Sequence, residues 1–114
     1  MISGISDRAT VSRLFSEGRT QRSRDLRIRY LDTEVTAQVQ VAFSISRKVG
    51  NAVVRNRTRR RLRSALVEIL GERATQIEAA MIIVYPSAVD RRYSELRDQL
   101  VEIMEKIEKS RIDG

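Results

Sequence analysis

Apolar and polar residues alternate along two stretches in the first half of the chain, and each stretch predicts a strand. In "TEVTAQVQVAFSIS", residues 33 to 46, every second side chain is apolar, which is typical of a strand with one buried face. The apolar positions are Val35, Ala37, Val39, Val41, Phe43 and Ile45. In a shorter stretch, Leu26, Ile28 and Tyr30 alternate with arginines. Residues 32–34 would then form the tight turn of an antiparallel hairpin, with room for a break in its second strand near residues 37–39.

Helical spacing predicts a long central helix from about Asn51 to Leu70. Asn51 is a suitable N-cap and Gly71 follows the last helical residue. At about 100 degrees per residue, one continuous apolar stripe results. It consists of Val54, Thr58, Leu62, Ala65, Leu66, Ile69 and Leu70.

Two more helices are predicted near the ends of the chain. The first spans residues 10–17, begins at Thr10 as its cap and ends before Gly18. The last would be capped by Ser87 or Ser94. Its apolar stripe is Leu96, Leu100, Ile103, Met104 and Ile107.

The remaining segments complete a one-domain prediction. Residues 18–25 are polar and predict a loop, whereas "AAMIIVY" before Pro86 predicts a short buried strand. The order is then helix, strand, strand, helix, strand, helix. This order predicts a single domain over residues 1–114, of the α+β class, with helices packed on a small sheet.

Positive charge is concentrated in one segment of the chain. Of the net charge of +7, residues 47–63 contribute eight bases, so the remainder sums to 7 minus 8, or −1. No acid occurs between Glu34 and Glu68. A local excess of this kind indicates an anionic partner.

The predicted central helix places three of these bases on one ridge. Measured from Leu62, Arg55, Arg59 and Arg63 lie at about 20, 60 and 100 degrees, while Arg57 and Arg60 point away from the apolar stripe. A solvated helix face is the alternative interpretation. However, like charges four residues apart destabilise a helix, and cations near its N-terminus oppose the helix dipole. Bound phosphates would offset both costs, and guanidinium groups suit phosphate oxygens.

The turn before this helix has two interpretations. Strand, glycine and helix N-terminus together can present backbone amides to a phosphate. Equally, Gly50 could only make the turn and Asn51 could only cap the helix. The segment matches neither a P-loop nor a dinucleotide fingerprint.

Missing residue types exclude several chemistries. The chain has no Cys and no His, which excludes disulfides, thiolate nucleophiles, imidazole bases and the usual zinc sites. The first 15 residues lack the apolar run of a signal peptide, and we find no membrane span, so we expect a cytoplasmic protein.

The basic segment also resembles a family signature. "SRKVGNAVVRNRTRRRLR", residues 46–63, is similar to the signature of the bacterial ribonuclease P protein subunit, whose core reads K-x-G-N-A-V-x-R-N-R. In this chain the core begins at Lys48 and ends at Arg57 without a gap. The resemblance extends over roughly residues 8–108, including "VSRLFSEG" and "YSELRDQL".

This resemblance implies a fold and a function. The fold would be a small α/β sandwich with a central, mainly antiparallel four-stranded sheet, as in one ribosomal protein domain, and a left-handed βαβ crossover, against the usual handedness. The protein would bind a catalytic RNA. That RNA, with Mg²⁺ bound mainly by itself, hydrolyses precursor tRNA to release the 5′ leader. The protein would strengthen substrate and Mg²⁺ binding and supply no catalytic residue and no metal ligand.

The resemblance also implies site residues. Those expected to bind or support RNA are Arg47, Lys48, Gly50, Asn51, Arg55, Asn56, Arg57, Arg59, Arg60 and Arg63. Those expected to contact the single-stranded leader, in a cleft between the first helix and the sheet, are Val11, Phe15 and Leu26. Only Phe15 of these three is aromatic, which indicates a weaker or less base-selective leader contact, and Phe15 could equally be an ordinary core residue.

Three functional hypotheses follow. In the first, the partners are the catalytic RNA of ribonuclease P and precursor tRNA, with no membrane and no obligate protein partner. In the second, the chain is a general RNA-binding module, such as a ribosomal or RNA-chaperone protein. A DNA-binding regulator is disfavoured because the basic helix follows a strand rather than another helix.

Overall fold

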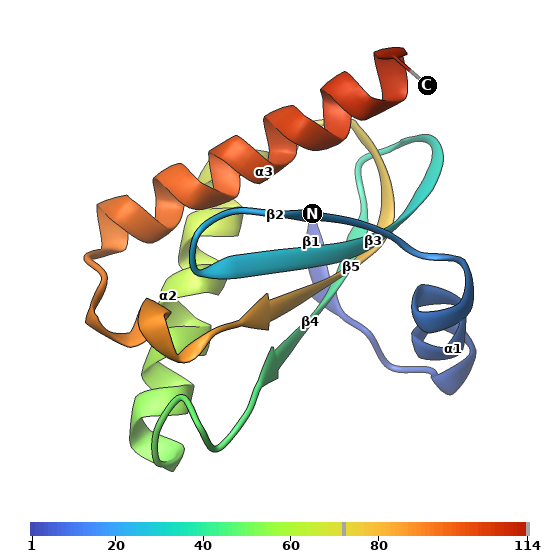
Figure 1. Ribbon diagram of the computed structural model, residues 1–114. Coiled ribbons are helices and arrows are strands. Elements are labelled where there is room, and N and C mark those ends of the chain that lie inside the picture. Colours follow the sequence, from blue (N-terminus) through green and yellow to red (C-terminus); the bar gives the residue numbers. More distant parts are fainter. Residues whose placement is uncertain (72, 114) are drawn as a thin grey trace.

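Within residues 1–71 and 73–113, which a computed structural model describes, the chain forms one five-stranded sheet and three α-helices (Figure 1). The elements in chain order are β1 (Ile2–Gly4), α1 (Arg8–Glu17), β2 (Arg19–Arg22), β3 (Leu26–Thr36), β4 (Val39–Ile45), α2 (Ala52–Leu70), β5 (Thr75–Val84), the 3-10 helix η1 (Pro86–Asp90) and α3 (Tyr93–Asp113). The predicted α+β class is therefore confirmed.

The strand order in the sheet is β1-β4-β5-β3-β2. Of its four pairings, β1 with β4 and β4 with β5 are parallel, whereas β2 with β3 and β3 with β5 are antiparallel. The sheet thus has one strand more than the four expected and is mixed rather than mainly antiparallel. The pair β4–β5 is parallel because α2 connects these two strands as a βαβ unit. The hand of this crossover stays a prediction.

The hairpin predicted between the first two strands of the sequence, with its turn at residues 32–34, is wrong. β3 continues through residues 32–34 to Thr36, and β5 lies between β3 and β4. The register between β3 and β5 shifts on both sides of Asp32, so the alternation is broken there. Val35, expected on the buried face, is consequently 68% exposed. The anticipated break falls at residues 37–38, between β3 and β4.

The polar segment after α1 is a strand rather than the predicted loop. Residues 19–22 form β2, which pairs with residues 27–30 at one end of the sheet order. An edge strand of four mostly exposed residues has no apolar alternation to reveal it. β1 has only three residues, which is too short for a periodic pattern to predict it from the sequence.

Two predicted caps are also different in the structure. Asp7 caps α1, since its Oδ2 accepts hydrogen bonds from the backbone N and the Oγ1 of Thr10, at 3.1 and 3.0 Å. Thr10, predicted as the cap, therefore lies inside the helix. At the start of α3, Ser94 lies within the helix and Ser87 belongs to η1. The Ser87 hydroxyl donates to Asp25 instead.

The helices cover both faces of the sheet (Figure 1). α2 and α3 lie on one face and bury the main core, which includes Ile28, Tyr30, Val41, Leu62, Leu66, Ile82, Leu100 and Ile103. α1 lies on the other face, where Leu14 packs with Leu31 and Ala79. The predicted stripes of the two long helices supply buried residues of this core, so amphipathic periodicity fixes how α2 and α3 lie.

A buried carboxylate joins three segments at one end of the sheet. The side chain of Asp25, in the turn between β2 and β3, is 0% exposed. It accepts hydrogen bonds from Ser87 of η1, from Arg91 Nε at 2.8 Å and from Gln99 Nε2 of α3 at 2.6 Å. The Oε1 of Gln99 in turn accepts from the Asp25 backbone N at 2.8 Å. This network fixes the loops at the end of the sheet where β4 passes into α2.

Candidate nucleic-acid interface

The turn before α2 is held by its own hydrogen bonds. Val49 N donates to Ser46 O at 3.0 Å and Gly50 N donates to Arg47 O at 3.2 Å. Asn51 is the N-cap predicted for α2, because its Oδ1 accepts from Val54 N at 3.0 Å. The Gly50 amide and the Asn51 side chain are thus used inside the protein, which favours their structural interpretation over direct phosphate contact.

Gly50 is also required by close packing. A Cβ added at this position would lie 2.8 Å from Val54 Cγ1, a distance that real Cβ atoms do not show. The turn after β4 can therefore lead into α2 only if residue 50 has no side chain. Gly50 fixes where the basic helix begins.

The basic side chains of α2 differ in their exposure. Arg57, Arg60 and Arg63 are exposed, as is Asn56, whereas Arg55 and Arg59 are half-buried. The Nε of Arg55 is buried and finds no hydrogen-bond partner among the described residues. Arg59 Nη1 donates to Asn56 Oδ1 at 2.7 Å. Arg47 and Lys48 are exposed in the turn before the helix.

These charges have no acidic partners in the part of the chain that the structure describes. None of its ion pairs involves any of the eight bases between residues 47 and 63. The arginines of α1, α3 and the sheet edge behave differently, as in Arg13 with Glu78 at 2.7 Å and Arg97 with Glu68 at 2.9 Å. The positive field of α2 is therefore uncompensated and can attract a polyanion.

The three residues predicted to contact a leader are not brought together. Phe15 of α1 is 60% exposed and Val11, one turn before it, is half-buried. Leu26 is 0% exposed and belongs to the main core, on the face of the sheet opposite α1. It therefore offers no surface to an RNA strand, and its place in this set was wrong. Leu26 was included because of the family resemblance, although its parity with Ile28 and Tyr30 already indicated burial.

Besides Leu31, which packs against α1, β3 places two arginines on the face that it shares with α1. Arg29 donates to the backbone oxygens of Leu14 and Phe15, the latter from Nη2 at 2.7 Å, and to Thr20 Oγ1 from Nη1 at 3.2 Å. Arg27 is exposed on the same face. Neither arginine was predicted as a site residue, although their alternation with Leu26 and Ile28 already places them on the opposite face of the strand.

A further contact extends this basic face to the next strand. The guanidinium carbon of Arg22, the last residue of β2, lies 5.6 Å from the ring centroid of Tyr85. A cation over an aromatic ring at this distance is attracted by the ring quadrupole. Tyr85 follows β5 directly, so this pair lies at the same end of the sheet as the turn into α2.

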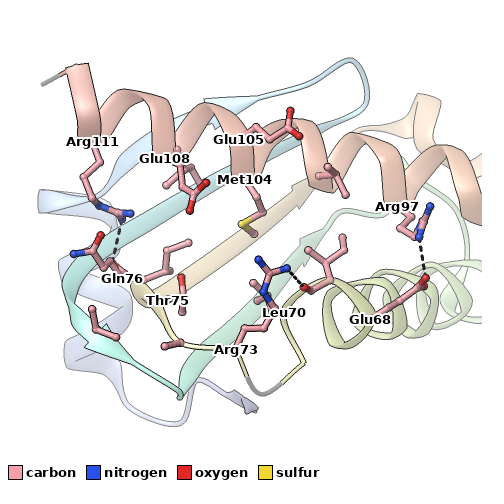
Figure 2. A pocket seen from close by; sticks show the side chains of 16 residues that line it. Glu68, Leu70, Arg73, Thr75, Gln76, Arg97, Met104, Glu105, Glu108 and Arg111 are labelled. Atoms are coloured by element: carbon pink, nitrogen blue, oxygen red, sulfur yellow. Dashed lines mark hydrogen bonds and ion pairs between the residues drawn. The ribbon is translucent and has the colours of Figure 1, made fainter.

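The cavity in Figure 2 is chemically different from this surface. It measures about 630 Å³ and lies between α3, the end of α2 and the start of β5. Its rim carries three arginines and three glutamates, namely Arg73, Arg97, Arg111, Glu68, Glu105 and Glu108. Because these charges balance, the cavity does not concentrate an anion. No predicted site residue lines it.

No helix within residues 1–71 and 73–113 is both long and apolar enough to cross a membrane. Nor do these residues contain a group of three or more acidic side chains placed to hold a metal ion.

Known proteins of one family are similar to this chain over most of its length. The family model described as Ribonuclease P matches residues 3–108. A ribonuclease P protein component of Symbiobacterium thermophilum is 32% identical over 102 residues, covering 90% of this chain and 88% of that protein. One of Bacillus cereus is 31% identical over 99 residues, covering 87% and 85%.

Solved structures share the fold. A ribonuclease P protein of Thermotoga maritima superimposes with a TM-score of 0.77 at 15% identity, covering 91% of this chain and 96% of that one. A Staphylococcus aureus ribonuclease P protein, a mutant with defective mRNA degradation activity, gives a TM-score of 0.77 at 19% identity, covering 91% and 86%. At these identities the likeness concerns the fold.

Proposed function

The chain belongs to the ribonuclease P protein family, and on this premise we propose that it is the RNA-binding protein subunit of the ribonucleoprotein that removes the 5′ leader from precursor tRNA. The observation that carries this proposal is the set of eight bases at residues 47–63, none of which is ion-paired within the described chain. An uncompensated arginine surface on a rigid helix suits the phosphate backbone of a folded RNA.

The exposed side chains of α2 would make the phosphate contacts. Arg57, Arg60 and Arg63 can each donate two parallel hydrogen bonds to one phosphate. Half-buried Arg59 is oriented by its bond to Asn56, so less side-chain freedom is lost when it binds. Arg47 and Lys48 extend the surface into the preceding turn.

The face of the sheet beside α1 would take the single-stranded leader. Phe15 supplies an exposed ring on which a base can stack, worth about 1–3 kcal/mol for such contacts. Arg27 supplies charge for the backbone of the same strand. With arginine rather than aromatic side chains on this part of β3, the leader contact would depend more on charge than on base identity.

Hydrolysis would be carried out by the RNA subunit with Mg²⁺. This chain has no His and no Cys, and its described residues contain no group of three or more acidic side chains placed to hold a metal ion. We therefore assign it no step through the metal. Its contribution is to bind RNA phosphates and so to lower the repulsion between catalytic RNA and substrate.

Cleavage of precursor tRNA tests this proposal. The ribonuclease P RNA from the same genome is assayed at low Mg²⁺ with and without the protein, and cleavage is expected to rise when the protein is present. Replacing both Arg57 and Arg63 with Glu should remove the stimulation. These exposed positions are preferable to Arg55, whose buried Nε would leave a glutamate partly buried.

The control and the alternative are measured in the same assay. Lys109→Glu reverses one exposed charge on α3 and should leave the stimulation intact. If the wild-type protein binds the RNA and cleavage is unchanged, the chain is a general RNA-binding module instead. Growth of a strain that lacks its own ribonuclease P protein and carries this one gives a second, cellular readout.

A further inference from the structure

A second basic surface lies on the other side of α2, facing the start of α3. Five side chains line a depression of about 290 Å³, namely Arg57, Arg60, Arg61, Ser64 and Tyr93. This volume is at the lower end of small-molecule pockets and suits a group no larger than one nucleotide. Arg57 and Arg60 are shared with the phosphate contacts of α2 described above, whereas Arg61, Ser64 and Tyr93 belong to none of the predicted contacts.

The depression is separate from the ridge formed by Arg55, Arg59 and Arg63. At about 100 degrees per residue from Leu62, that ridge occupies about 20–100 degrees. The four α2 residues of the depression occupy about 160–260 degrees on the same scale. One helix therefore presents guanidinium groups in two directions.

The depression has a strong net positive charge. Its three arginines form no ion pair within the described part of the chain. The acid nearest in the sequence of α2 is Glu68, which is already paired with Arg97 at 2.9 Å. Glu68 also accepts a hydrogen bond from the Tyr93 hydroxyl at 2.9 Å. Its carboxylate is thus engaged by Arg97 and Tyr93.

The same bond fixes the aromatic wall of the depression. Because Tyr93 Oη donates to Glu68 Oε2, the ring is held at its polar end. Burial and this hydrogen bond both raise the pKa of Tyr93, so the hydroxyl keeps its proton and the ring stays neutral. The ring remains half-exposed beside three guanidinium groups. A fixed ring beside cations is suited to a nucleotide, with the base on the ring and the phosphate on the cations.

We propose that this depression is a second RNA-binding site, in which Arg57, Arg60, Arg61 and the Ser64 hydroxyl hold one backbone phosphate and Tyr93 stacks with the adjacent base. This inference rests on the proposed function, since it takes RNA as the partner. Under it, α2 is contacted by two RNA segments, one on each arginine face, rather than by a single strand.

Binding of the cognate ribonuclease P RNA tests the depression directly. Arg61→Ala should weaken binding about tenfold, as expected for loss of a charge-assisted contact, and should reduce the slope of log affinity against log salt by about 0.7–0.9. Lys109→Ala removes one exposed charge from α3 and should change binding less than twofold. Thermal unfolding confirms that each variant is folded.

The tyrosine gives an independent measurement. Tyr93→Phe keeps the ring and should bind within about threefold of wild type, whereas Tyr93→Leu should weaken binding about tenfold with an unchanged salt slope, because stacking is not a charge contact. Equal effects of Phe and Leu would overturn the stacking role.

Cross-linking tests whether the two faces meet different RNA segments. Because the chain has no cysteine, Ser64→Cys and Asn56→Cys each create a unique attachment point for a photoreactive group. Cross-links to different nucleotides are expected, and cross-links from both positions to the same nucleotides would overturn the second site. Full binding by Arg61→Ala would also overturn it while leaving the proposed function intact. Failure of the wild-type protein to bind the RNA would instead refute the proposed function.

Discussion

Arg91 donates its Nε hydrogen to Oδ2 of Asp25 over 2.8 Å, and this contact ties the segment after η1 to the turn between β2 and β3. The Asp25 side chain is 0% exposed, whereas that of Arg91 is 26% exposed. A buried carboxylate without partners would be strongly destabilising, but this one is fully engaged by hydrogen bonds.

Acid unfolding tests the contribution of Asp25. Burial alone would raise its pKa, but the hydrogen bonds from Ser87, Gln99 and Arg91 outweigh burial and lower the pKa below its ordinary value of 3.8. A carboxylate with a lowered pKa in the folded state stabilises the protein at neutral pH, and this stabilisation is lost as the pH falls from the unfolded toward the folded pKa.

Asp25→Asn should therefore lower the free energy of unfolding by about 3 kcal/mol at pH 7, because it leaves Arg91 without its buried partner. Urea unfolding at several pH values measures the difference between wild type and variant. The difference should narrow as the pH falls below about 4. A constant difference across this range would contradict the ionised state of Asp25.

Leu26 and Phe15 should respond oppositely to truncation. Leu26→Ala removes a fully buried side chain and should cost about 2–5 kcal/mol of stability, with unchanged RNA affinity while the protein is folded. Phe15→Ala removes a 60% exposed ring, so stability should change by less than about 1 kcal/mol. Its affinity for precursor tRNA should fall about fivefold or more, and only when a leader is present. Filter binding with and without the leader separates the two outcomes.

Arg29 should control how firmly α1 is held against the sheet. Its guanidinium group donates to the backbone oxygens of Leu14 and Phe15, so Arg29→Ala leaves the last carbonyls of α1 without this partner. Hydrogen exchange of the α1 amides should accelerate, while the amides of α2 remain protected. Arg27→Ala, an exposed position on the same strand face, is the matched control and should leave α1 exchange unchanged.

The two asparagines of the basic segment differ in structural importance. Asn51→Ala deletes the N-cap bond to Val54 N and should cost about 1 kcal/mol of stability. Asn56→Ala deletes only an exposed bond to Arg59 and should cost a few tenths of a kcal/mol. Denaturant midpoints of the two variants provide the comparison, and equal losses would argue against the capping role.

Salt should weaken RNA binding steeply. If about five phosphates are neutralised, the slope of log affinity against log salt should be about −3.5 for single-stranded RNA. Titrations between low and physiological salt measure this slope directly. A flat response would mean that the unpaired arginines of α2 do not contact phosphates.

Strong periodicity made some elements predictable. The stripe that includes Leu62 and Leu66 located α2 correctly, with Asn51 and Gly71 at its two ends, because amphipathic spacing and capping agreed. The same count placed the arginines on this helix. The α3 stripe was equally reliable.

Short and tertiary features were not predictable. β1 and β2 are edge strands of three and four residues, too short to show a period. The pairing of β3 with β5 depends on contacts between residues about 50 positions apart, which local pattern does not encode. Leu26 was misplaced because its role came from the family and not from its parity. The place of Tyr93 beside Arg61 was not predictable, since the two residues line one depression only because α3 packs on α2.

The position of β5 in the sheet has a consequence during protein synthesis. β5 pairs with both β4 and β3, yet it is the last strand to be made. Until Thr75–Val84 has left the ribosome, only two separate two-stranded pieces can form, β1 with β4 and β2 with β3, and such pieces are marginally stable in water. A chain that stops before Thr75 therefore lacks the strand that joins these two pieces, so the arginine helix α2 has no complete sheet to pack on until most of the protein has been translated.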